Sequence, residues 1–436
     1  MKKIVLLVID GAADRALPEL DGKTPLQAAL TPRLDRLAAN STLGSLLPRH
    51  DFKGASTDLT HFAFLGYEPE SYPGRSVLEA QALGLQPKLG RIYFSALLCG
   101  SIVKEGKTYL VRENVPFLEE EAKELFKEIS YFYSGFYSFK LFFQKGRYGI
   151  LEVAGPFEKG TTDTDPFKDG FPVSKPLPAS SSFRDVSLTK ALEAYLVWAR
   201  NKLISSEINR KRKNKGLLAM DLLVTKWPSF LKTSLPSFFE LTGMKGAVVS
   251  SQSFFKGMAT LLDMEFVQLT AEQTKDKLEQ ALTASKELLF TRDFDFVLIN
   301  IKDVDEASHK KNPHFKVKVI AKVDAGLEKL EACGLLDKKR VVLALTADHP
   351  TPSTGNLIHS GEPTPLLVHA DYLAPDRTTA FNEVDAREGS LPQLCAENLL
   401  AFLMNAADRI AYSGSMMSNK KRLGFYLPNE ISNFQF

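Results

Sequence analysis

Short apolar runs alternate with amphipathic stretches along most of this chain, as in proteins that pack helices on a β-sheet. Residues 4–9 and 340–346 are almost uninterruptedly apolar, the pattern of strands buried on both faces of a parallel sheet. Further runs predict strands at residues 217–225, 246–250, 266–269 and 294–301, and helices at residues 186–204, 254–262, 274–290 and 317–333. This order predicts an α/β fold with a mostly parallel sheet and helices on both faces.

Two Thr-Pro pairs mark helix starts near the N-terminus. Thr24 and Thr31 are expected to be N-caps, since each is followed by a proline suited to the first helical position. We therefore expect two short helices that end near residue 38. The leucines expected to face inward are Leu26, Leu30, Leu34 and Leu37.

Residues 90–178 are richer in aromatic residues and lysine than the rest of the chain. A helix is predicted at residues 118–130 and a strand at 148–153, and no RNP-like motif accompanies the aromatic residues, so we expect an aromatic core. The expected organisation is a core at residues 1–89 and 179–413, an inserted α+β domain at 90–178 and a loosely attached tail at 414–436.

Composition and charge exclude several classes of protein. The 436 residues carry a formal net charge of +3, too balanced for a dedicated nucleic-acid binder, and the basic run at 210–215 is expected to be a solvated loop. The sequence contains no stretch of about twenty apolar residues, so no membrane span is predicted. The apolar run that ends at Asp10 is too short for a signal peptide and predicts a first strand.

Three cysteines, Cys99, Cys333 and Cys395, show no metal-ligand spacing. Their odd number indicates a reducing compartment, with core or incidental positions for the thiols. We therefore expect a cytoplasmic protein.

Metal-ligand residue types follow two of the predicted strands directly. Asp348 and His349 come just after the strand at 340–346, where open α/β sheets place ligands. Neighbouring residues of an extended chain point to opposite sides, so the pair can reach two different ions. Asp10 follows the first strand in the same way, although an Asp-Gly pair by itself is more often a turn.

A second group of donors follows the strand at 294–301. Asp305 and His309 are four residues apart and share one face if this segment is helical, although such spacing is also common on exposed helices. His359 lies ten residues after His349 and could join them. The histidines taken as structural or exposed are His50, His61, His314 and His369.

Thr57 stands among small polar residues before an apolar run that predicts a helix. Such a residue is usually an N-cap. The alternative is a hydroxyl that attacks phosphorus at the positive start of the helix, activated by a metal ion.

Two ligand sets can be assembled from these residues. One set is Asp305, His309 and His359; the other is Asp10, Thr57, Asp348 and His349. Mixed carboxylate and imidazole ligands suit Mn²⁺ or Zn²⁺ better than Mg²⁺ or Ca²⁺. Two such ions about 3.5–4 Å apart would stabilise an in-line displacement at phosphorus and suit an anionic substrate.

The order and spacing of these pieces resemble the archaeal-type cofactor-independent phosphoglycerate mutases, in the alkaline phosphatase superfamily. The resemblance runs to about residue 399. The matching segments are residues 8–11, 22–26, 57–61, 65–69, 74–75, 79–80, 162–166, 302, 305–307, 309, 346–349 and 359.

By this resemblance, Thr57 stands where the family has a nucleophilic serine. Asp58, Arg112, Arg147 and Lys302 would contact a small phosphorylated substrate, and the inserted domain at 90–178 would close over it. The chain also departs from the family. Where the family has arginines that hold carboxylate and phosphate groups bidentately, this chain has Ser95, a shortened segment at 111–114 and Thr225-Lys226.

Three hypotheses follow. The first is a metal-dependent phosphomutase that interconverts 2- and 3-phosphoglycerate through a phosphothreonine intermediate. The second, suggested by the missing arginines, is a phosphohydrolase or phosphotransferase that acts on a different phosphate ester. The third is a non-catalytic relative that binds a partner through its aromatic insertion. In each case we expect neither a nucleic-acid nor a membrane partner, and the oligomeric state stays open.

Overall fold

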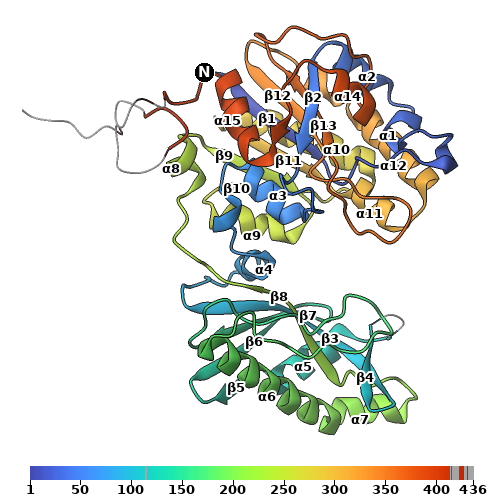
Figure 1. Cartoon of the computed structure of the whole chain (residues 1–436), viewed down its shortest axis with the longest axis vertical. Helices are drawn as coiled ribbons and strands as arrows, with labels where there is room; N and C mark the ends of the chain where they lie inside the picture. The colour runs from blue at the N-terminus through green and yellow to red at the C-terminus, as the bar shows by residue number, and fades with distance from the viewer. Residues whose placement is uncertain (113–114, 413, 415–421, 427–429, 431–436) are drawn as a thin grey trace, which may run out of the picture. The chain divides into compact units, whose positions relative to one another are not determined.

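The computed structural model describes residues 1–112, 115–412, 414, 422–426 and 430. The chain forms two compact units (Figure 1). The first contains residues 1–72 and 235–436, and the second contains residues 73–234.

An eight-stranded sheet forms the centre of the first unit. Its order is β10 (Glu265–Gln268), β9 (Gly246–Ser250), β11 (Phe296–Ile301), β1 (Lys3–Ile9), β12 (Val341–Thr346), β13 (Thr364–His369), β2 (Thr42–Leu47) and β14 (Leu394–Cys395). Neighbouring strands are parallel from β10 to β12, whereas β13 is antiparallel to both β12 and β2. The predicted mostly parallel sheet is therefore confirmed.

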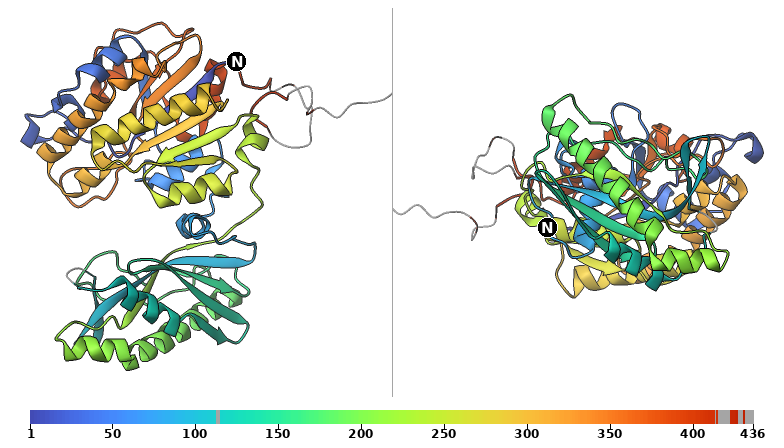
Figure 2. Two further views of the ribbon diagram at one scale, coloured as in Figure 1. Left: turned by 180° about the vertical axis from the view of Figure 1, so that it is seen from behind. Right: turned by 90° about the horizontal axis from the view of Figure 1, so that it is seen from below.

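Helices cover both faces of this sheet (Figure 2). α10 (Thr274–Phe290) and α12 (Pro313–Gly326) pack in one buried core with Val5, Leu7 and Ile9, the residues of β1 that point to their face. α3 (Thr57–Phe64), α9 (Ser253–Leu261) and α15 (Ala396–Ala406) lie on the other face. Residues 4–9 are each exposed by 1% or less, so the prediction of a strand buried on both faces is confirmed.

Shorter helices complete the first unit. They are α1 (Pro25–Ala28), α2 (Pro32–Ala39), α8 (Phe238–Thr242), α11 (Asp303–His309), α13 (Lys329–Ala332) and α14 (Glu383–Glu388), with 3-10 turns at Pro18–Leu20 and Pro69–Ser71.

The predicted helix starts are partly correct. Thr24 caps α1 in a reciprocal pair with Gln27, as expected, whereas Thr31 makes no capping hydrogen bond at α2. The prediction that Leu30 faces inward is wrong: its side chain is 80% exposed, because α1 ends at Ala28 and Leu30 lies in the link between the helices. The helix predicted at 317–333 is interrupted after Gly326.

The second unit contains an antiparallel sheet. Its order is β4 (Lys107–Val111), β3 (Arg91–Lys104), β7 (Tyr148–Ala154), β6 (Tyr137–Lys145) and β5 (Tyr131–Ser134), with β8 (Leu222–Ser229) paired to β3. The helices are α4 (Arg75–Ala82), α5 (Glu119–Glu128), α6 (Phe183–Ser205) and α7 (Glu207–Asn214). Phe94, Phe126, Phe139 and Tyr195 are buried together, so the aromatic residues form a core as predicted.

The second unit extends beyond the predicted insertion at 90–178. Residues 73–89 and 179–234, both assigned to the core from the sequence, belong to the second unit and supply α4, α6, α7 and β8 to it. β8 pairs with β3, with Leu97 opposite Val224, instead of joining the parallel sheet. An apolar run predicts a strand but does not indicate which sheet it joins.

The basic run at 210–215 is exposed as predicted, apart from Arg212, but it is helical rather than a loop. It continues α7, and Arg212 is 1% exposed. Its guanidinium donates to Glu121 at 2.6 Å and to the carbonyl oxygens of Pro116 and Leu218. The aliphatic part of an arginine can be buried where its head group finds such acceptors.

Most of the tail predicted at 414–436 lies outside the described residues. In the described part, the backbone of Leu423 exchanges hydrogen bonds of 2.8 Å with Leu241 and Ala411. This segment is therefore attached to the first unit rather than loose. Among the described helices, none is long and apolar enough to cross a membrane.

Replacing Arg212 by Met is expected to destabilise the protein by about 3 kcal/mol, because Glu121 and two carbonyl oxygens lose their donors. Urea unfolding followed through Trp198 fluorescence measures this change. Arg210→Met, on an exposed position of the same helix, is the control and should change stability by less than about 0.5 kcal/mol. Equal effects of the two substitutions would contradict the role of the buried contacts.

Candidate metal centre

The candidate metal ligands come from loops at one edge of the parallel sheet. Asp10 follows β1, α11 follows β11, and Asp348 with His349 follows β12. The three strands are parallel neighbours, with Ile9 opposite Ile301 and Val8 opposite Thr346. Their carboxyl ends therefore lie side by side. Open α/β sheets bind their ligands at this edge.

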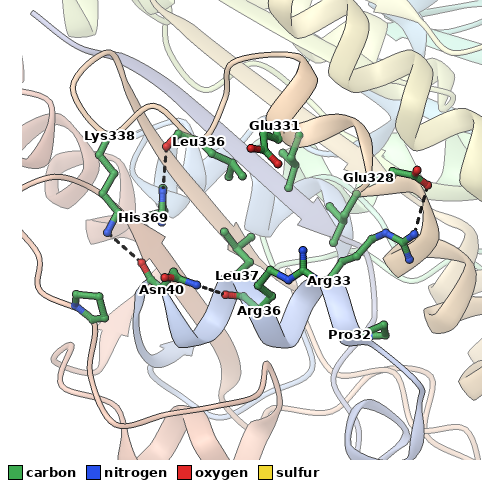
Figure 3. A pocket seen from close by; sticks show the side chains of 13 residues that line it. Pro32, Arg33, Arg36, Leu37, Asn40, Glu328, Glu331, Leu336, Lys338 and His369 are labelled. Atoms are coloured by element: carbon green, nitrogen blue, oxygen red, sulfur yellow. Dashed lines mark hydrogen bonds and ion pairs between the residues drawn. The ribbon is translucent and has the colours of Figure 1, made fainter.

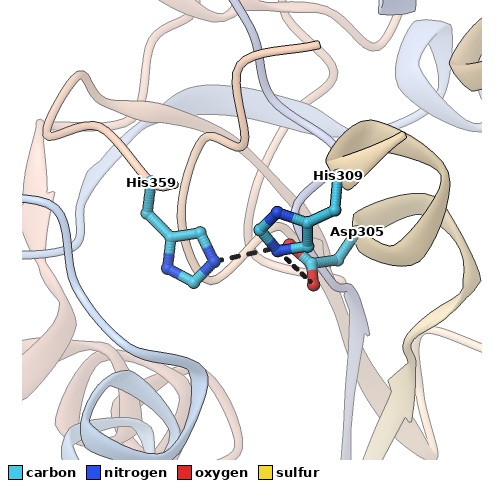
Figure 4. A group of neighbouring side chains, drawn as sticks. All are labelled: Asp305, His309 and His359. Carbon is cyan, nitrogen blue, oxygen red and sulfur yellow. Dashed lines mark ion pairs between the residues drawn. The ribbon is translucent and has the colours of Figure 1, made fainter. Parts of the chain in front are cut away.

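Asp305, His309 and His359 form the more exposed of two clusters (Figure 4). Both histidine rings point toward the carboxylate, with Nε2 of His309 at 3.2 Å from Oδ2 and Nε2 of His359 at 3.5 Å from Oδ1. Asp305 and His309 lie four residues apart on α11, so the condition that this segment be helical is met. Asp305 is buried, whereas the side chain of His309 is 38% exposed.

Asp10, Asp348 and His349 form the second cluster, which is completely buried. Nε2 of His349 lies 3.1 Å from Oδ2 of Asp348 and 3.8 Å from Oδ1 of Asp10. Gly11 allows this close packing: its φ is +64°, and a Cβ there would lie 2.6 Å from Oγ1 of Thr351 and 2.7 Å from Cβ of Asp305.

The two clusters are in direct contact. The rings of His349 and His359 stack with centroids 3.7 Å apart. The amine of Lys302 lies 3.0 Å from Oδ1 of Asp10 and 2.8 Å from Oδ2 of Asp305, so it contacts one carboxylate of each cluster.

Thr57 is the first residue of α3 and lies at this junction. Its Oγ1 is 3.1 Å from Nε2 of His349 and accepts a hydrogen bond of 3.1 Å from Lys302. Ser56, and not Thr57, is the N-cap residue of α3, and the Thr57 hydroxyl lies between His349 and Lys302. The adjacent Asp58 is buried and accepts a hydrogen bond from the hydroxyl of Tyr72.

Thr351 links the clusters and was not identified from the sequence. Its hydroxyl donates to Oδ1 of Asp305 at 2.7 Å, so at 3.1 Å it accepts from Nδ1 of His349. A proton on Nδ1 leaves the lone pair of Nε2 facing Asp10 and Asp348, which is the tautomer that a metal ligand needs.

His61 and Asn300 form a second supporting pair. His61, whose role was uncertain from the sequence, is completely buried, and its Nδ1 donates to the carbonyl oxygen of Thr57 at 2.7 Å. Asn300 donates to Oδ2 of Asp10 at 2.9 Å and lies 3.3 Å from Nε2 of His61. In the sequence, Asn300 stands out only as a polar residue within the apolar strand predicted at 294–301.

The chemistry of the buried cluster fits a cation. Burial, and then the neighbouring Asp348, raises the pKa of Asp10 to about 7. Among the described residues, Oδ2 of Asp348 has no hydrogen-bond partner. Acceptor atoms of two carboxylates and one imidazole thus converge away from water, where unneutralised charge is costly. A divalent cation is the group that this donor set can satisfy.

The electrostatics of the neighbouring groups agree with this conclusion. Burial opposes ionisation of Asp305, but hydrogen bonds from His309 and His359 hold the pKa of its carboxyl well below the usual range. Burial likewise opposes the charge on Lys302, yet Asp10 and Asp305 raise the pKa of its amine.

The other predicted residues lie elsewhere. Arg112 and Arg147 belong to the second unit, while residues 113 and 114 of the shortened segment lie outside the described residues. His50 and His314 are exposed. His369 is buried at a separate cavity of ≈ 760 Å³ beside α2, where its nitrogens lie 2.9 Å from Oγ of Ser41 and 3.2 Å from the carbonyl of Leu336 (Figure 3).

Comparison with known proteins agrees with this geometry. A family model described as the metalloenzyme superfamily matches residues 2–406, and the chain belongs to that superfamily, which implies divalent metal ions. Within it, the chain belongs to the family of the 2,3-bisphosphoglycerate-independent phosphoglycerate mutases. It is 33% identical to such a mutase of Methanocaldococcus jannaschii over 98% of both chains. It is 31% identical to one of Methanopyrus kandleri over 95% of this chain and 98% of that relative.

Solved structures give the same result. A cofactor-independent phosphoglycerate mutase from Thermoplasma acidophilum is 30% identical and superimposes with a TM-score of 0.63, over 93% of this chain and all of that one. A Pyrococcus horikoshii protein that is 25% identical reaches a TM-score of 0.76, over 95% of this chain and 99% of that one. The resemblance inferred from the sequence is therefore confirmed at the level of the family.

Thr351→Val is expected to weaken binding of Mn²⁺ by about 10- to 100-fold, because His349 and Asp305 lose the hydroxyl that orients both. Isothermal titration calorimetry of the metal-free protein measures this directly. Thr351→Ser keeps the hydroxyl and should restore most of the affinity. Wild-type affinity in the valine variant would show that Thr351 does not orient the ligands.

Proposed function

We propose that this protein is a metal-dependent phosphomutase that interconverts 2- and 3-phosphoglycerate through a phosphothreonine at Thr57. The proposal rests on the Thr57 hydroxyl, which lies against His349 of the buried cluster and against Lys302, whose amine contacts one carboxylate of each cluster. The names of the relatives, all phosphoglycerate mutases, supply the substrate. The relatives are also named as independent of 2,3-bisphosphoglycerate, which agrees with a phosphoryl carrier built into the chain.

We assign two metal sites to the clusters. Asp305, His309 and His359 would hold one ion; Asp10, Thr57, Asp348 and His349 would hold the other. Mixed carboxylate and imidazole donors favour Mn²⁺ or Zn²⁺ over Mg²⁺. When bound, the ions supply Lewis-acid stabilisation of negative charge on the Thr57 hydroxyl and the phosphoryl oxygens.

The chain's own residues account for the transfer. Oγ1 of Thr57 attacks the phosphorus of the substrate; the phosphorus–oxygen bond to one glycerate hydroxyl breaks, and that oxygen gains the proton that Thr57 loses. The other glycerate hydroxyl then attacks the phosphothreonine, which restores Thr57. The phosphoryl group moves only between Thr57 and the two glycerate hydroxyls, so no inorganic phosphate is released.

Lys302 has the contacts to stabilise this step. Its amine donates to Oγ1 of Thr57 at 3.1 Å and stays protonated beside Asp10 and Asp305. A fixed positive charge next to the attacking oxygen favours its deprotonated form and the incoming phosphoryl group. Lys302 and Asp58 are our candidates for substrate contact in the first unit.

Phosphate-ester hydrolysis or transfer is the second candidate, and specific residues favour it. By the resemblance, Ser95 stands in place of a family arginine and Thr225-Lys226 in place of an Arg-Gly element, so the pocket for the rest of the substrate would be altered. Arg112 and Arg147 remain as candidate substrate contacts, and closure of the second unit over the substrate stays a prediction.

We also propose a cytoplasmic location and a small phosphorylated substrate.

Phosphorus NMR of the Mn²⁺-loaded protein with 3-phosphoglycerate separates the candidates. A mutase gives the 2-phosphoglycerate resonance without added 2,3-bisphosphoglycerate and without inorganic phosphate. Accumulation of inorganic phosphate, here or with other phosphate esters, would establish the hydrolase instead. A protein that neither takes up metal nor turns over any ester would be the non-catalytic relative.

Thr57→Ala should reduce phosphoryl transfer at least about 1,000-fold, because the variant has no hydroxyl to carry the phosphoryl group. The initial rate of 2-phosphoglycerate formation measures the loss. Thr57→Ser keeps a hydroxyl and should retain activity within about tenfold of the wild type. Full activity in the alanine variant would exclude Thr57 from the mechanism.

His309→Ala should lower the metal content from about two ions to about one per chain, because the exposed cluster loses one of three ligands while the buried cluster stays intact. Elemental analysis after gel filtration measures the content. Thr57→Ala, with six other ligands in place, and His314→Ala, outside both clusters, should each keep about two. An unchanged metal content in His309→Ala would remove that residue from the ligand set.

A further inference from the structure

Lys316 of α12 has a completely buried side chain. Its amine donates three hydrogen bonds: one of 3.0 Å to the carbonyl oxygen of Ala13, one of 3.2 Å to Oδ2 of Asp14 and one of 2.9 Å to the carbonyl oxygen of Thr351. A lysine amine has three donor hydrogens, so this set uses all of them. Burial lowers the pKa of the amine, and the carboxylate of Asp14 opposes that change. A buried charge is tolerated where it is paired and fully hydrogen-bonded in this way.

The three acceptors belong to the two loops that carry the buried cluster. Ala13 lies three residues after Asp10, and Thr351 lies two residues after His349. The loops also contact each other directly, because the N–H of Thr351 donates to the carbonyl oxygen of Ala13 at 3.0 Å. That carbonyl oxygen therefore accepts from the backbone of the other loop and from Lys316, which bonds to both loops at once.

Asp14 extends the same junction. Its Oδ2 accepts from the N–H of Ser353 at 2.9 Å and from the hydroxyl of Ser353 at 2.7 Å. Its own N–H donates to Oε1 of Glu383 at 2.9 Å, while the hydroxyl of Thr24 donates to Oε2 of Glu383 at 2.6 Å. All four side chains are buried, so the acceptors that surround the amine cannot turn to water instead.

The helix that carries Lys316 is itself held firmly. Val319, Ile320 and Val323 of α12 lie in the main buried core of the first unit. Asp324, farther along the same helix, accepts hydrogen bonds of 2.9 and 2.8 Å from two backbone N–H groups of α2. Lys316 thus extends from a fixed helix to two loops that have no regular structure of their own.

These bonds reach only one of the two metal clusters directly. Among the described residues, the amine of Lys316 donates no hydrogen bond to the exposed cluster of Asp305, His309 and His359. The connection to that cluster is indirect, through the hydroxyl of Thr351 on Asp305. Loss of the amine should therefore act on the buried cluster first.

We propose that Lys316 is a positioning residue for the buried metal site. Its ammonium group holds the loop that carries Asp10 against the loop that carries Asp348 and His349, and it does so before a divalent cation binds. This inference rests on the metal sites assigned under the proposed function, and it is independent of the substrate and of the reaction.

His309→Ala isolates the buried site, because it removes a ligand of the exposed cluster. The metal-free full-length protein with this substitution is titrated with Mn²⁺ by isothermal titration calorimetry. Adding Lys316→Met should weaken binding at least about tenfold, since methionine fills the space but donates no hydrogen bond. Lys318→Met, at an exposed position of α12, is the matched control and should bind within about twofold of the His309→Ala parent.

Asp348→Ala isolates the exposed site in the same way. In this background, Lys316→Met should change the affinity for Mn²⁺ by less than about twofold. A general loosening of the fold would instead weaken both sites, and equal losses in the two backgrounds would overturn the positioning role.

Hydrogen exchange tests the loops without any metal. In the metal-free protein, the amides of Thr351 and Ser353 should exchange at least about tenfold faster in Lys316→Met than in the wild type, while the amides of β11 keep their rates. Unchanged exchange at both loop amides would contradict the inference. If Lys316→Met does not fold, Lys316→Gln, which keeps two donor hydrogens at a shorter reach, replaces it in each comparison and should show a smaller change in the same direction.

The outcomes separate this inference from the proposed function. If neither the wild type nor His309→Ala takes up Mn²⁺, the metal assignment fails, and the positioning role of Lys316 fails with it. If His309→Ala binds Mn²⁺ and the addition of Lys316→Met leaves that affinity unchanged, the inference is overturned and the proposed function stands. A loss confined to the buried site, together with faster exchange of the loop amides, supports the inference.

Discussion

The arrangement of this protein's first unit depends on the burial of three carboxylates at one edge of a parallel sheet. Asp10, Asp305 and Asp348 are each exposed by 1% or less. Carboxylates in such surroundings need cations or several donors, and the described structure provides one lysine and a set of histidines. The same requirement explains why metal ligands occur at the ends of three neighbouring strands, where loops from distant parts of the chain can meet.

The candidate metal ligands are held in place by hydrogen bonds from neighbouring residues. Thr351 uses one hydroxyl to contact ligands of both clusters, and Asn300 connects Asp10 to His61. Lys316, fully buried, adds a bond of 3.0 Å to the carbonyl of Ala13 and one of 2.9 Å to that of Thr351. These contacts join the loops after β1 and β12, so that the positions of the ligands are fixed before any ion binds.

The two units present different chemistry. The first concentrates negative charge and imidazoles around one hydroxyl, which suits cations and phosphoryl transfer. In the second, Arg75 and Lys226 lie over the ring of Trp227, and Arg147 lies over that of Phe117. By the resemblance found in the sequence, the candidate metal ligands match the family's pattern, whereas Ser95 and Thr225-Lys226 depart from it.

The apolar runs and the spacing of Asp and His determined the α/β class, the central strands and the residues that meet at the candidate metal centre, because strand burial and helical spacing are local properties of the chain. The tertiary structure alone decided that β8 joins the antiparallel sheet, that Arg212 is buried, and that Thr351 and Asn300 support the ligands. Each of these depends on a partner far away in the sequence, and hydrogen-bond partners brought together by folding leave no periodic signal in the residues that form them.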